Sequence, residues 1–301
     1  MGANHVRVLS RIADAELVGV CDVVPAKAEK MAGDHGIRAF TELAPLLDTV
    51  DGVVLATPTV SHVEVGREIL DRGRHLLVEK PIADTVAGAD ELLAAAGDRR
   101  LAVGHVEFFN PAVQALLTGD IGKPGFVEIH RLAAFSRRSL DIDVVLDLMI
   151  HDLQILHALD GSPLADLRAT GVSVLSDRAD IANARLELES GCVANVTASR
   201  VSAERIRKLR VFAPPSYFSI DYHQQQVHGV ALEVSGAERR FAPCRLEVQP
   251  ADALECELTA FLGAIRGEPV RLVDGRQGRR ALETALAVAE AMAQHRLKRR
   301  A

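Results

Sequence analysis

The stretch "RHLLVEKP" (residues 74–81) decides the fold, because its apolar residues follow one another without polar residues between them. A strand with one face in water alternates apolar and polar side chains, whereas a continuous Leu/Val run is typical of a strand covered on both faces. The stretches "GVVLATP" (52–58) and "RLAVGHV" (100–106) have the same character. Together the three runs predict strands of a buried parallel sheet.

Helical segments separate these runs. "SHVEVGREILDRG" (61–73) and "TVAGADELLAAAGD" (85–98) lie between the predicted strands, and "PAKAEKMAGDHG" (25–36) follows an earlier strand, "ELVGVCD" (16–22). A proline at the start and a glycine at the end of 25–36 mark the two ends of a helix. Strands that alternate with helices predict an α/β domain with a Rossmann-type parallel sheet over residues 1–106.

The pattern changes after this domain. Several strands joined by turns follow one another between about 168 and 235, with little helix among them, which predicts a large open, mostly antiparallel sheet. We therefore predict a second, α+β domain over residues 107–301, whose C-terminal helix can pack back on the first domain. The helices predicted for this half are 108–122, 144–161, 253–267 and 275–297.

The composition of the 301 residues is that of a globular protein, with 48% hydrophobic and 25% charged residues. A formal net charge of -6 gives no reason to expect a nucleic-acid partner. No export signal and no apolar run long enough to span a membrane is present, so we expect a cytoplasmic protein. The cysteines are Cys21, Cys192, Cys244 and Cys256. No pair of them has the spacing of metal ligands, and we predict no metal site.

The N-terminal region has part of a dinucleotide site. Asp22 ends a predicted strand, where an acid accepts hydrogen bonds from the adenosine ribose and disfavours a 2′-phosphate, so it favours NAD over NADP; a helix cap is the alternative. The G-x-G-x-x-G fingerprint is missing. "MGANHVRVLSRI" (1–12) reads as the helix that follows it, with Gly2 as its third glycine. We interpret the first strand as absent, through a misplaced start or an incomplete chain; a natural variant without cofactor binding is the alternative.

Four motifs occur in an order and spacing that resemble the Gfo/Idh/MocA oxidoreductases over nearly the whole chain. They are "ATPTVSH" (56–62), "LLVEKPIA" (76–83), "GHVEFFNP" (104–111) and "DLMIHDL" (147–153). The resemblance implies a Rossmann domain, a second domain built on an open sheet, and NAD(P)-dependent oxidation of sugars, cyclitols or their derivatives. It also implies a homodimer or homotetramer joined through the sheet of the second domain.

The resemblance makes Lys80, Asp147 and His151 the catalytic residues. Oxidation of a secondary alcohol sends a hydride to the nicotinamide and a proton to a base. Lys80, at a strand tip and oriented by Glu79, can stabilise charge on the substrate oxygen, and the family implies a cis bond to the following proline. His151, of a residue type with a pKa near neutrality, can accept the hydroxyl proton, and Asp147 lies four residues earlier on the same helix face. Asp152 points about 100° away from His151 and is expected to pair structurally.

Further residues are assigned by the same resemblance, which places the 56–62 stretch against the nicotinamide and its ribose. The expected cofactor contacts are Gly2, Asp22, Thr57, Pro58, His62, Glu79 and Lys80. The expected substrate contacts are Lys80, Asn110, Arg137, Asp147 and His151. Arg131, Arg137 and Arg138 are of the type that binds a diphosphate, because guanidinium groups match phosphate oxygens. A solvated basic turn is the alternative for the last two.

The motifs around residues 104 and 144 resemble most the branch that acts on nucleotide-activated sugars, similar to UDP-N-acetylglucosamine 3-dehydrogenases. One residue departs from that branch, since Phe108 stands where an arginine is usual. A free sugar or an inositol is therefore the alternative substrate. A non-catalytic sugar-binding or regulatory relative is the alternative of another class, and the presence of Lys80, Asp147 and His151 argues against it.

Overall fold

The computed structural model describes residues 1–135, 142–235 and 238–298, and its contacts divide the chain into two compact units. Unit 1 comprises Met1–Val106 and Asp252–Arg279, and unit 2 comprises Glu107–Ala251 and Arg280–Ala301. The boundary after residue 106 coincides with the predicted one. Residues 252–279 differ from the prediction, because they belong to the first unit.

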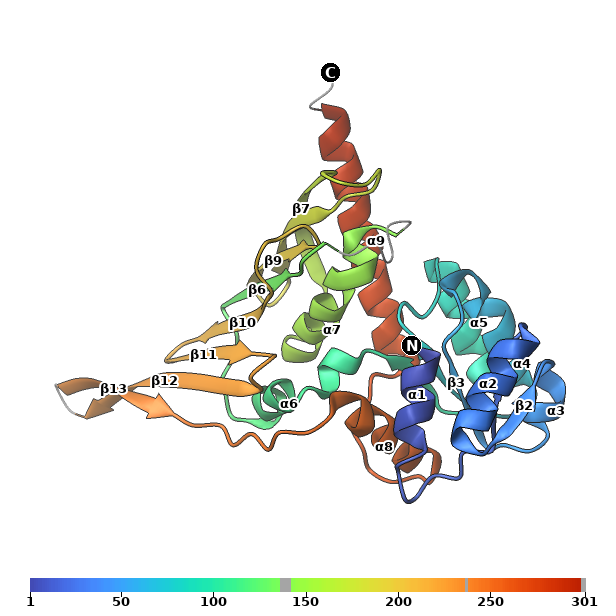
Figure 1. Ribbon diagram of the computed structural model, residues 1–301. Coiled ribbons are helices and arrows are strands. Elements are labelled where there is room, and N and C mark those ends of the chain that lie inside the picture. The colour runs from blue at the N-terminus through green and yellow to red at the C-terminus, as the bar shows by residue number, and fades with distance from the viewer. Residues whose placement is uncertain (136–141, 236–237, 299–301) are drawn as a thin grey trace. The chain divides into compact units, whose positions relative to one another are not determined.

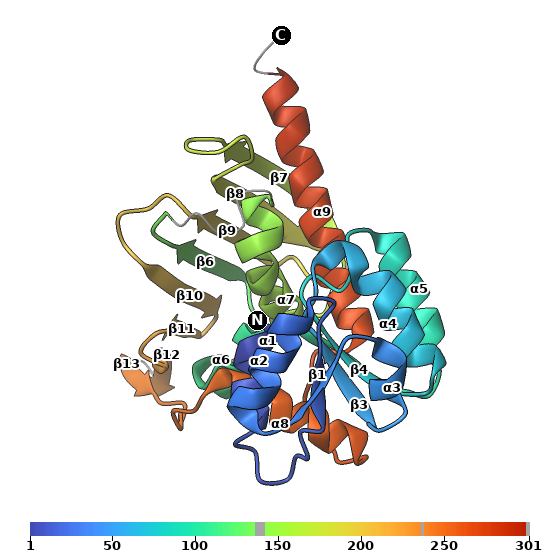
Figure 2. The same cartoon turned by 45° about the vertical axis from the view of Figure 1, so that its right-hand side comes forward.

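Unit 1 contains two parallel sheets (Figures 1 and 2). β4 is the middle strand of the larger sheet, and its residues Leu76, Leu77 and Val78 are at most 2% exposed. The prediction of buried parallel strands is therefore confirmed. The strands are β1 (Gly19–Cys21) with β2 (Arg38–Phe40), and β3 (Gly52–Leu55) with β4 (His75–Glu79) and β5 (Leu101–Gly104). Within the described residues no hydrogen-bonded ladder joins β1 to β3, the place where the first strand was expected.

Helices α4 and α5 pack against each other beside the larger sheet (Figure 2). A Cβ atom at Gly66 would lie 2.8 Å from Leu92 Cδ2, so glycine lets the two helices approach closely without displacing that buried side chain. α2 begins at Pro25 and ends before Gly36, whose φ of 67° is left-handed, as the sequence predicts. The helices are α2 (Pro25–His35), α3 (Leu43–Leu47), α4 (His62–Asp71) and α5 (Val86–Ala96).

An apolar core joins α1 (Gly2–Leu9) and α8 (Ala253–Ile265) to the larger sheet, although about 250 residues separate the two helices in the sequence. The core comprises Val8, Leu77, Ala102, Leu254, Leu258 and Phe261. Burial of this apolar surface accounts for the place of α8 in unit 1 rather than in unit 2.

Unit 2 is built on one eight-stranded sheet of order β13-β12-β11-β10-β6-β9-β8-β7. Among the described strands of this sheet, only the pair β6–β9 is parallel, which confirms the predicted mostly antiparallel sheet. The strands are β6 (Phe126–Leu132), β7 (Leu164–Val172), β8 (Ile181–Leu188), β9 (Val193–Ser199), β10 (Ile206–Ala213), β11 (Ser216–Asp221), β12 (Gln226–Ser235) and β13 (Glu238–Cys244).

One face of this sheet is covered by helices, as Figure 1 shows for α7 and α9. Buried and exposed residues alternate along β8, so one face of the strand packs on the helices while the other faces outward. The core under α7 includes Leu153, Ile129 and Leu209, all fully buried. The helices are α6 (Pro111–Thr118), α7 (Ile150–Leu159) and α9 (Gly275–Lys298).

None of the helices in the described part of the chain combines the length and the apolar character that crossing a membrane requires. Within residues 1–135, 142–235 and 238–298, no group of three or more His, Cys, Asp or Glu side chains is arranged to hold a metal ion.

Candidate active site

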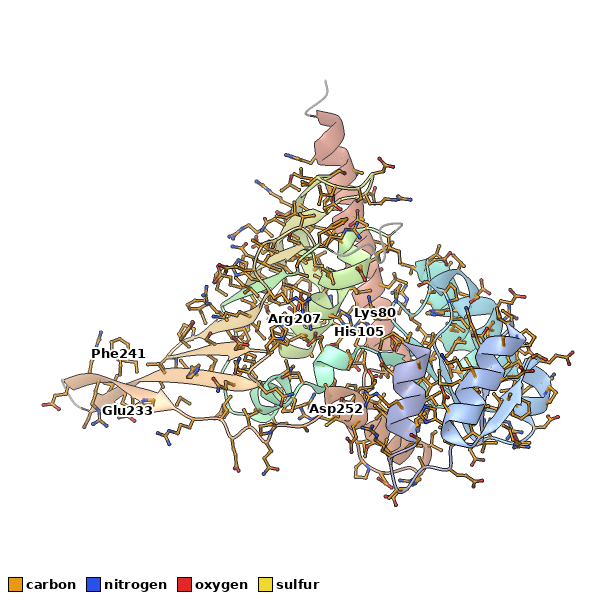
Figure 3. The ribbon with its side chains drawn as sticks, viewed as in Figure 1. Lys80, His105, Arg207, Glu233, Phe241 and Asp252 are labelled. Atoms are coloured by element: carbon orange, nitrogen blue, oxygen red, sulfur yellow. The ribbon has the colours of Figure 1, made fainter. Side chains whose placement is uncertain are left out.

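The carboxyl ends of the strands of unit 1 carry the predicted cofactor residues. Thr57 and Pro58 follow β3, Lys80 follows β4, and His105 follows β5; Figure 3 labels Lys80 and His105. Because β3, β4 and β5 are parallel, these ends lie along one edge of the sheet, where α/β proteins bind ligands. A Cβ atom at Gly2 would lie 3.9 Å from the Ala56 side chain, so the start of α1 reaches this edge.

The loop after β4 is tied to the loop after β3 by His62. The Lys80–Pro81 peptide bond is cis, as the resemblance implies. His62 Nδ1 lies 2.9 Å from the carbonyl oxygen of Pro81, and Nε2 lies 3.1 Å from that of Thr57. The His62 side chain was predicted as a cofactor contact, but it is only 1% exposed and both ring nitrogens face backbone carbonyls. The structure therefore gives it a different role, that of holding the two loops together.

Glu79 is directed into unit 1, towards α1 and β5. Its Oε1 lies 2.6 Å from Nε2 of His5, and both side chains are buried. A Cβ atom at Gly104 would lie 3.2 Å from the Glu79 carboxyl carbon, so the carboxylate packs closely on β5. His5 is a site residue that the sequence prediction missed. Its position one helical turn before Val8, in the buried stripe of α1, is the pattern that could have indicated it.

His105 lies close to the predicted catalytic lysine. Its imidazole is fully buried, and burial together with the positive charge of Lys80 lowers the pKa of His105 to about 3. The ring is therefore neutral at physiological pH. Because the His105 imidazole is uncharged, it does not repel the Lys80 ammonium group as a second cation would.

The residues after β1 and at the start of α1 suit the binding of a dinucleotide. One carboxylate oxygen of Asp22 accepts a hydrogen bond from the Val24 amide, 2.9 Å away, in the turn before α2, but it does not cap the helix, whose N-terminus has no side-chain cap. Asp22 remains partly exposed, which leaves its carboxylate accessible to ribose hydroxyls. No side chain caps the first turn of α1, whose N–H groups and dipole suit a pyrophosphate. These features fit the adenosine ribose and the pyrophosphate of NAD.

In unit 2, Asp147 and His151 lie on consecutive turns of different helix type. Asp147 belongs to a π-helical turn, η3 (Val145–Met149), and His151 to the following α7. The Asp147 amide donates to the Asp143 carbonyl, 3.0 Å away, and the Asp143 carboxylate accepts from Val145. The sequence predicted one continuous helix over 144–161. The π turn widens its start, and such turns occur frequently at functional sites.

Asp152 pairs with Arg131, which confirms its predicted structural role. Two guanidinium nitrogens of Arg131 lie 2.8 and 2.7 Å from the two Asp152 oxygens, and Nη1 lies 2.8 Å from Glu107 Oε1. Arg207 also donates to Glu107, at 2.8 Å. Arg131 was considered as a diphosphate ligand, and this is corrected, because its guanidinium is buried and its nitrogens bind two carboxylates of unit 2. The network fixes the helix position next to His151.

Opposite charges outweigh burial for Glu107 and Arg131, whereas for Asp152 burial outweighs the charge of Arg131 and raises the pKa. Burial by itself raises the pKa of Glu107, but the cations Arg131 and Arg207 lower it further than burial raises it. Burial by itself lowers the pKa of Arg131, but Asp152 and Glu107 raise it well above the usual range. Each ion therefore depends on its partners to remain charged in the interior.

Replacing Arg131 by methionine is expected to lower the free energy of unfolding by about 3–5 kcal/mol, because it leaves the buried Asp152 carboxylate without its cation and Glu107 with Arg207 alone. Arg210→Met is the matched control. Arg210 of β10 pairs at 2.6 Å with Glu128 of β6, the strand that also carries Arg131, but both side chains are partly exposed, and a loss of about 0–1 kcal/mol is expected. Urea unfolding of the two variants gives the comparison, and equal losses would contradict the structural role of the buried network.

Both polar atoms of the Asn110 side-chain amide make hydrogen bonds to the backbone. Its Oδ1 accepts from the Ala112 amide at 3.1 Å, which caps α6, and its Nδ2 donates to the Tyr222 carbonyl at 3.0 Å. The side chain is buried. This role differs from the substrate contact that the resemblance implies. Arg137 and Arg138, the other predicted ligands, lie outside the described residues.

Phe108, the departure from the nucleotide-sugar branch, is buried. Its ring packs edge-on against Phe109, with 5.2 Å between the ring centroids. An arginine at this position would bury a charge, whereas the phenyl ring adds apolar contact. Phenylalanine at position 108 is therefore compatible with the apolar interior of unit 2.

Comparison with known proteins gives matches along most of the chain. Residues 1–105 match a model described as an oxidoreductase family with an NAD-binding Rossmann fold, and residues 109–214 match the GFO/IDH/MocA C-terminal domain. The chain is 37% identical to the UDP-N-acetylglucosamine 3-dehydrogenase of Acidithiobacillus ferrooxidans, over 96% of this chain and 93% of the relative. It is 26% identical to the inositol 2-dehydrogenase of Rhizobium meliloti, over 98% and 95%.

Solved structures agree with these matches. A structure of the Acidithiobacillus ferrooxidans enzyme superposes with a TM-score of 0.89 at 37% identity, over 97% of this chain and 95% of that one. The WlbA dehydrogenase of Bordetella pertussis, solved with NADH and UDP-GlcNAcA, superposes with a TM-score of 0.82 at 19% identity, over 98% and 94%. The second likeness supports the fold alone.

Proposed function

Because the chain belongs to the GFO/IDH/MocA family of NAD-dependent oxidoreductases, we propose that it oxidises the C3 hydroxyl of UDP-N-acetylglucosamine to a ketone. The near full-length match to an enzyme of that name, at 37% identity, is the observation that carries the proposal. The strand-tip lysine and the D-x-x-x-H helix supply residue types that this oxidation needs.

The cofactor and the side chains have separate roles in this oxidation. NAD, when bound at the strand ends of unit 1, supplies the acceptor for the hydride. His151 accepts the proton of the substrate hydroxyl, and Asp147 holds the imidazole or the sugar in place. Lys80 stabilises the negative charge that develops on the substrate oxygen. Asp22 binds the adenosine ribose and repels a 2′-phosphate, which makes NAD the preferred cofactor.

The test is a panel of substrates and cofactors, with the formation of reduced nicotinamide followed by its absorbance. We expect reduction of NAD with UDP-N-acetylglucosamine, and much slower reduction of NADP. N-acetylglucosamine and myo-inositol are the matched controls, because each offers secondary hydroxyls without a nucleotide. Equal or faster reduction with either control would refute the nucleotide-sugar assignment.

A cyclitol or free sugar is the second candidate substrate. Two observations favour it: an inositol 2-dehydrogenase matches 98% of the chain, and Arg131 is used inside unit 2, which removes one expected ligand for a diphosphate. The same panel decides between the candidates. Reduction of NAD with myo-inositol but not with UDP-N-acetylglucosamine would establish the second one.

We also propose that the protein forms a homodimer or homotetramer through the outer face of the unit 2 sheet. Phe126, Phe212 and Tyr217 form a row on that face, with ring centroids 5.6 and 4.8 Å apart. Phe241 of β13, labelled in Figure 3, is 77% exposed. Exposed aromatic clusters of this kind mark interaction surfaces. A monomer in light scattering at micromolar concentration would contradict the assembly.

A further inference from the structure

A carboxyl group interrupts the apolar stripe of α8. The buried residues Leu254, Leu258 and Phe261 recur at helical spacing and pack into the core shared with α1 and the sheet. Glu257 lies in the same stripe, one position before Leu258, and is only 1% exposed. Its neighbour Glu255 is exposed on the same helix. An acid in this stripe needs an explanation, because burying an uncompensated carboxylate is strongly unfavourable.

Glu257 has no cation and no hydrogen-bond partner among the described residues. Neither carboxyl oxygen is within hydrogen-bond distance of a donor or acceptor there. Burial first, and the negative charge of Glu79 second, raise the pKa of Glu257 well above its usual range. Nδ1 of His5 is likewise buried without a partner in the described residues. Two incompletely satisfied groups therefore lie around Glu79.

Three buried ionisable groups border the apolar core to which α1, β4 and α8 each contribute. His5 comes from α1, Glu79 from β4 and Glu257 from α8, and the surrounding core of Val8, Leu77 and the α8 stripe is apolar. Glu79 immediately precedes Lys80, so whatever fixes the Glu79 carboxylate also restrains the backbone from which the lysine projects. Two neighbouring carboxyls in such a site cannot both ionise without a large penalty.

We propose that Glu257 is a positioning residue, a neutral acid that shares its proton with the Glu79 carboxylate through one buried water, and that this link, together with His5, holds Lys80 in place. A buried water with two to four polar partners is the usual means of satisfying such groups. The effect on turnover rests on the proposed function, whereas the protonation state does not. Sequence alone shows only an acid in an apolar stripe; its partners come from elements more than 170 residues away.

The pH dependence follows from the direction of the shift. Because the pKa of Glu257 is higher in the folded protein than its ordinary value of 4.5, its contribution to stability is fully present below pH 4.5. That contribution is lost as the pH rises through the higher, folded value. Glutamine cannot ionise, so Glu257→Gln should remove this component of the pH dependence. The buried ionisable residues of α1 and β4 are His5 and Glu79, while Arg7 and His75 of the same elements are only partly buried, and all four remain in that variant.

The experiment compares Glu257→Gln, Glu257→Leu and the control Glu255→Gln. Urea unfolding is measured from pH 5 to 9, and kcat and KM are measured with NAD and the substrate identified by the panel. We expect Glu257→Gln to keep kcat within about threefold, because its amide still donates a hydrogen bond, and to lose stability less steeply with pH. Glu257→Leu should lower kcat about tenfold or more at unchanged KM, while remaining folded. Glu255→Gln should follow the wild type throughout.

Two results would overturn the proposal. Wild-type kcat in Glu257→Leu would remove the positioning role, and an unchanged pH slope in Glu257→Gln would show that Glu257 is not a neutral acid. If the wild-type protein oxidises no member of the panel, the proposed function fails. The comparison of pH slopes then still decides the protonation state of Glu257.

Discussion

Replacing His151 by alanine is expected to lower kcat by about two to four orders of magnitude, the usual contribution of a general base. The variant loses the group that accepts the hydroxyl proton, and no other side chain is proposed for that step. Alanine favours the helical conformation of α7, and His151 is 9% exposed at the edge of the core, so the fold should survive. Steady-state kinetics together with circular dichroism measure both effects.

His157→Ala is the matched control for this variant. His157 lies on the same helix, and its Nε2 is 2.8 Å from the Thr284 hydroxyl within unit 2. Burial lowers the pKa of His157 to about 4, with the charge of Arg280 acting in the same direction, so this imidazole is neutral at physiological pH. Its removal should affect stability more than turnover. If His151→Ala retains a kcat close to that of His157→Ala, His151 is not the base.

Replacing Lys80 by alanine is expected to lower kcat by a similar factor, about 10² to 10⁴, for a different reason. The loss of the ammonium group removes the positive charge at the substrate oxygen, and such electrostatic stabilisation acts mainly in the transition state. NADH affinity, measured by fluorescence titration, should change far less than kcat. Lys27→Ala, an exposed position on α2, is the control and should leave both unchanged.

The pKa of the neighbouring His105 provides a second measurement on the Lys80→Ala variant. Burial and the Lys80 cation together lower the pKa of His105, so Lys80→Ala should raise that pKa from about 3. The rise should be partial, because burial is the larger cause and remains. Nuclear magnetic resonance of the imidazole can follow it. Turnover near the wild-type value in Lys80→Ala would exclude the lysine from the mechanism even if the pKa of His105 moves.

If the protein is instead a non-catalytic sugar-binding relative, the opposite kinetic result is expected. A binding protein would bind UDP-N-acetylglucosamine without reducing NAD, and Lys80→Ala and His151→Ala would differ from the wild type in affinity alone. Calorimetric titration of the sugar, beside the kinetic assay, separates this result from an inactive preparation.

Elements with a strong local pattern were predictable from the sequence. The apolar run 76–78 is buried on both faces, α2 begins at Pro25 and ends before Gly36, and α9 occupies the predicted C-terminal segment. Each has a local cause: a continuous Val/Leu run, a proline with a preset φ, or a glycine with a left-handed φ. β2, α3 and β13 were not predicted, because they are short or polar and depend on the strands beside them.

The sequence by itself determined the residue types available for the chemistry: a lysine at a strand tip, and an acid four residues before a histidine in an apolar helix. Only the tertiary structure decided what many side chains contact. It enclosed His62 between two carbonyls, directed Glu79 to His5, gave Asn110 a capping role and paired Arg131 with Asp152. Spacing along the chain predicts which face of a helix or strand a residue occupies. Which distant element covers that face depends on the packing of the whole unit, and this packing buried Glu257 of α8 beside the apolar core that α1, β4 and α8 share.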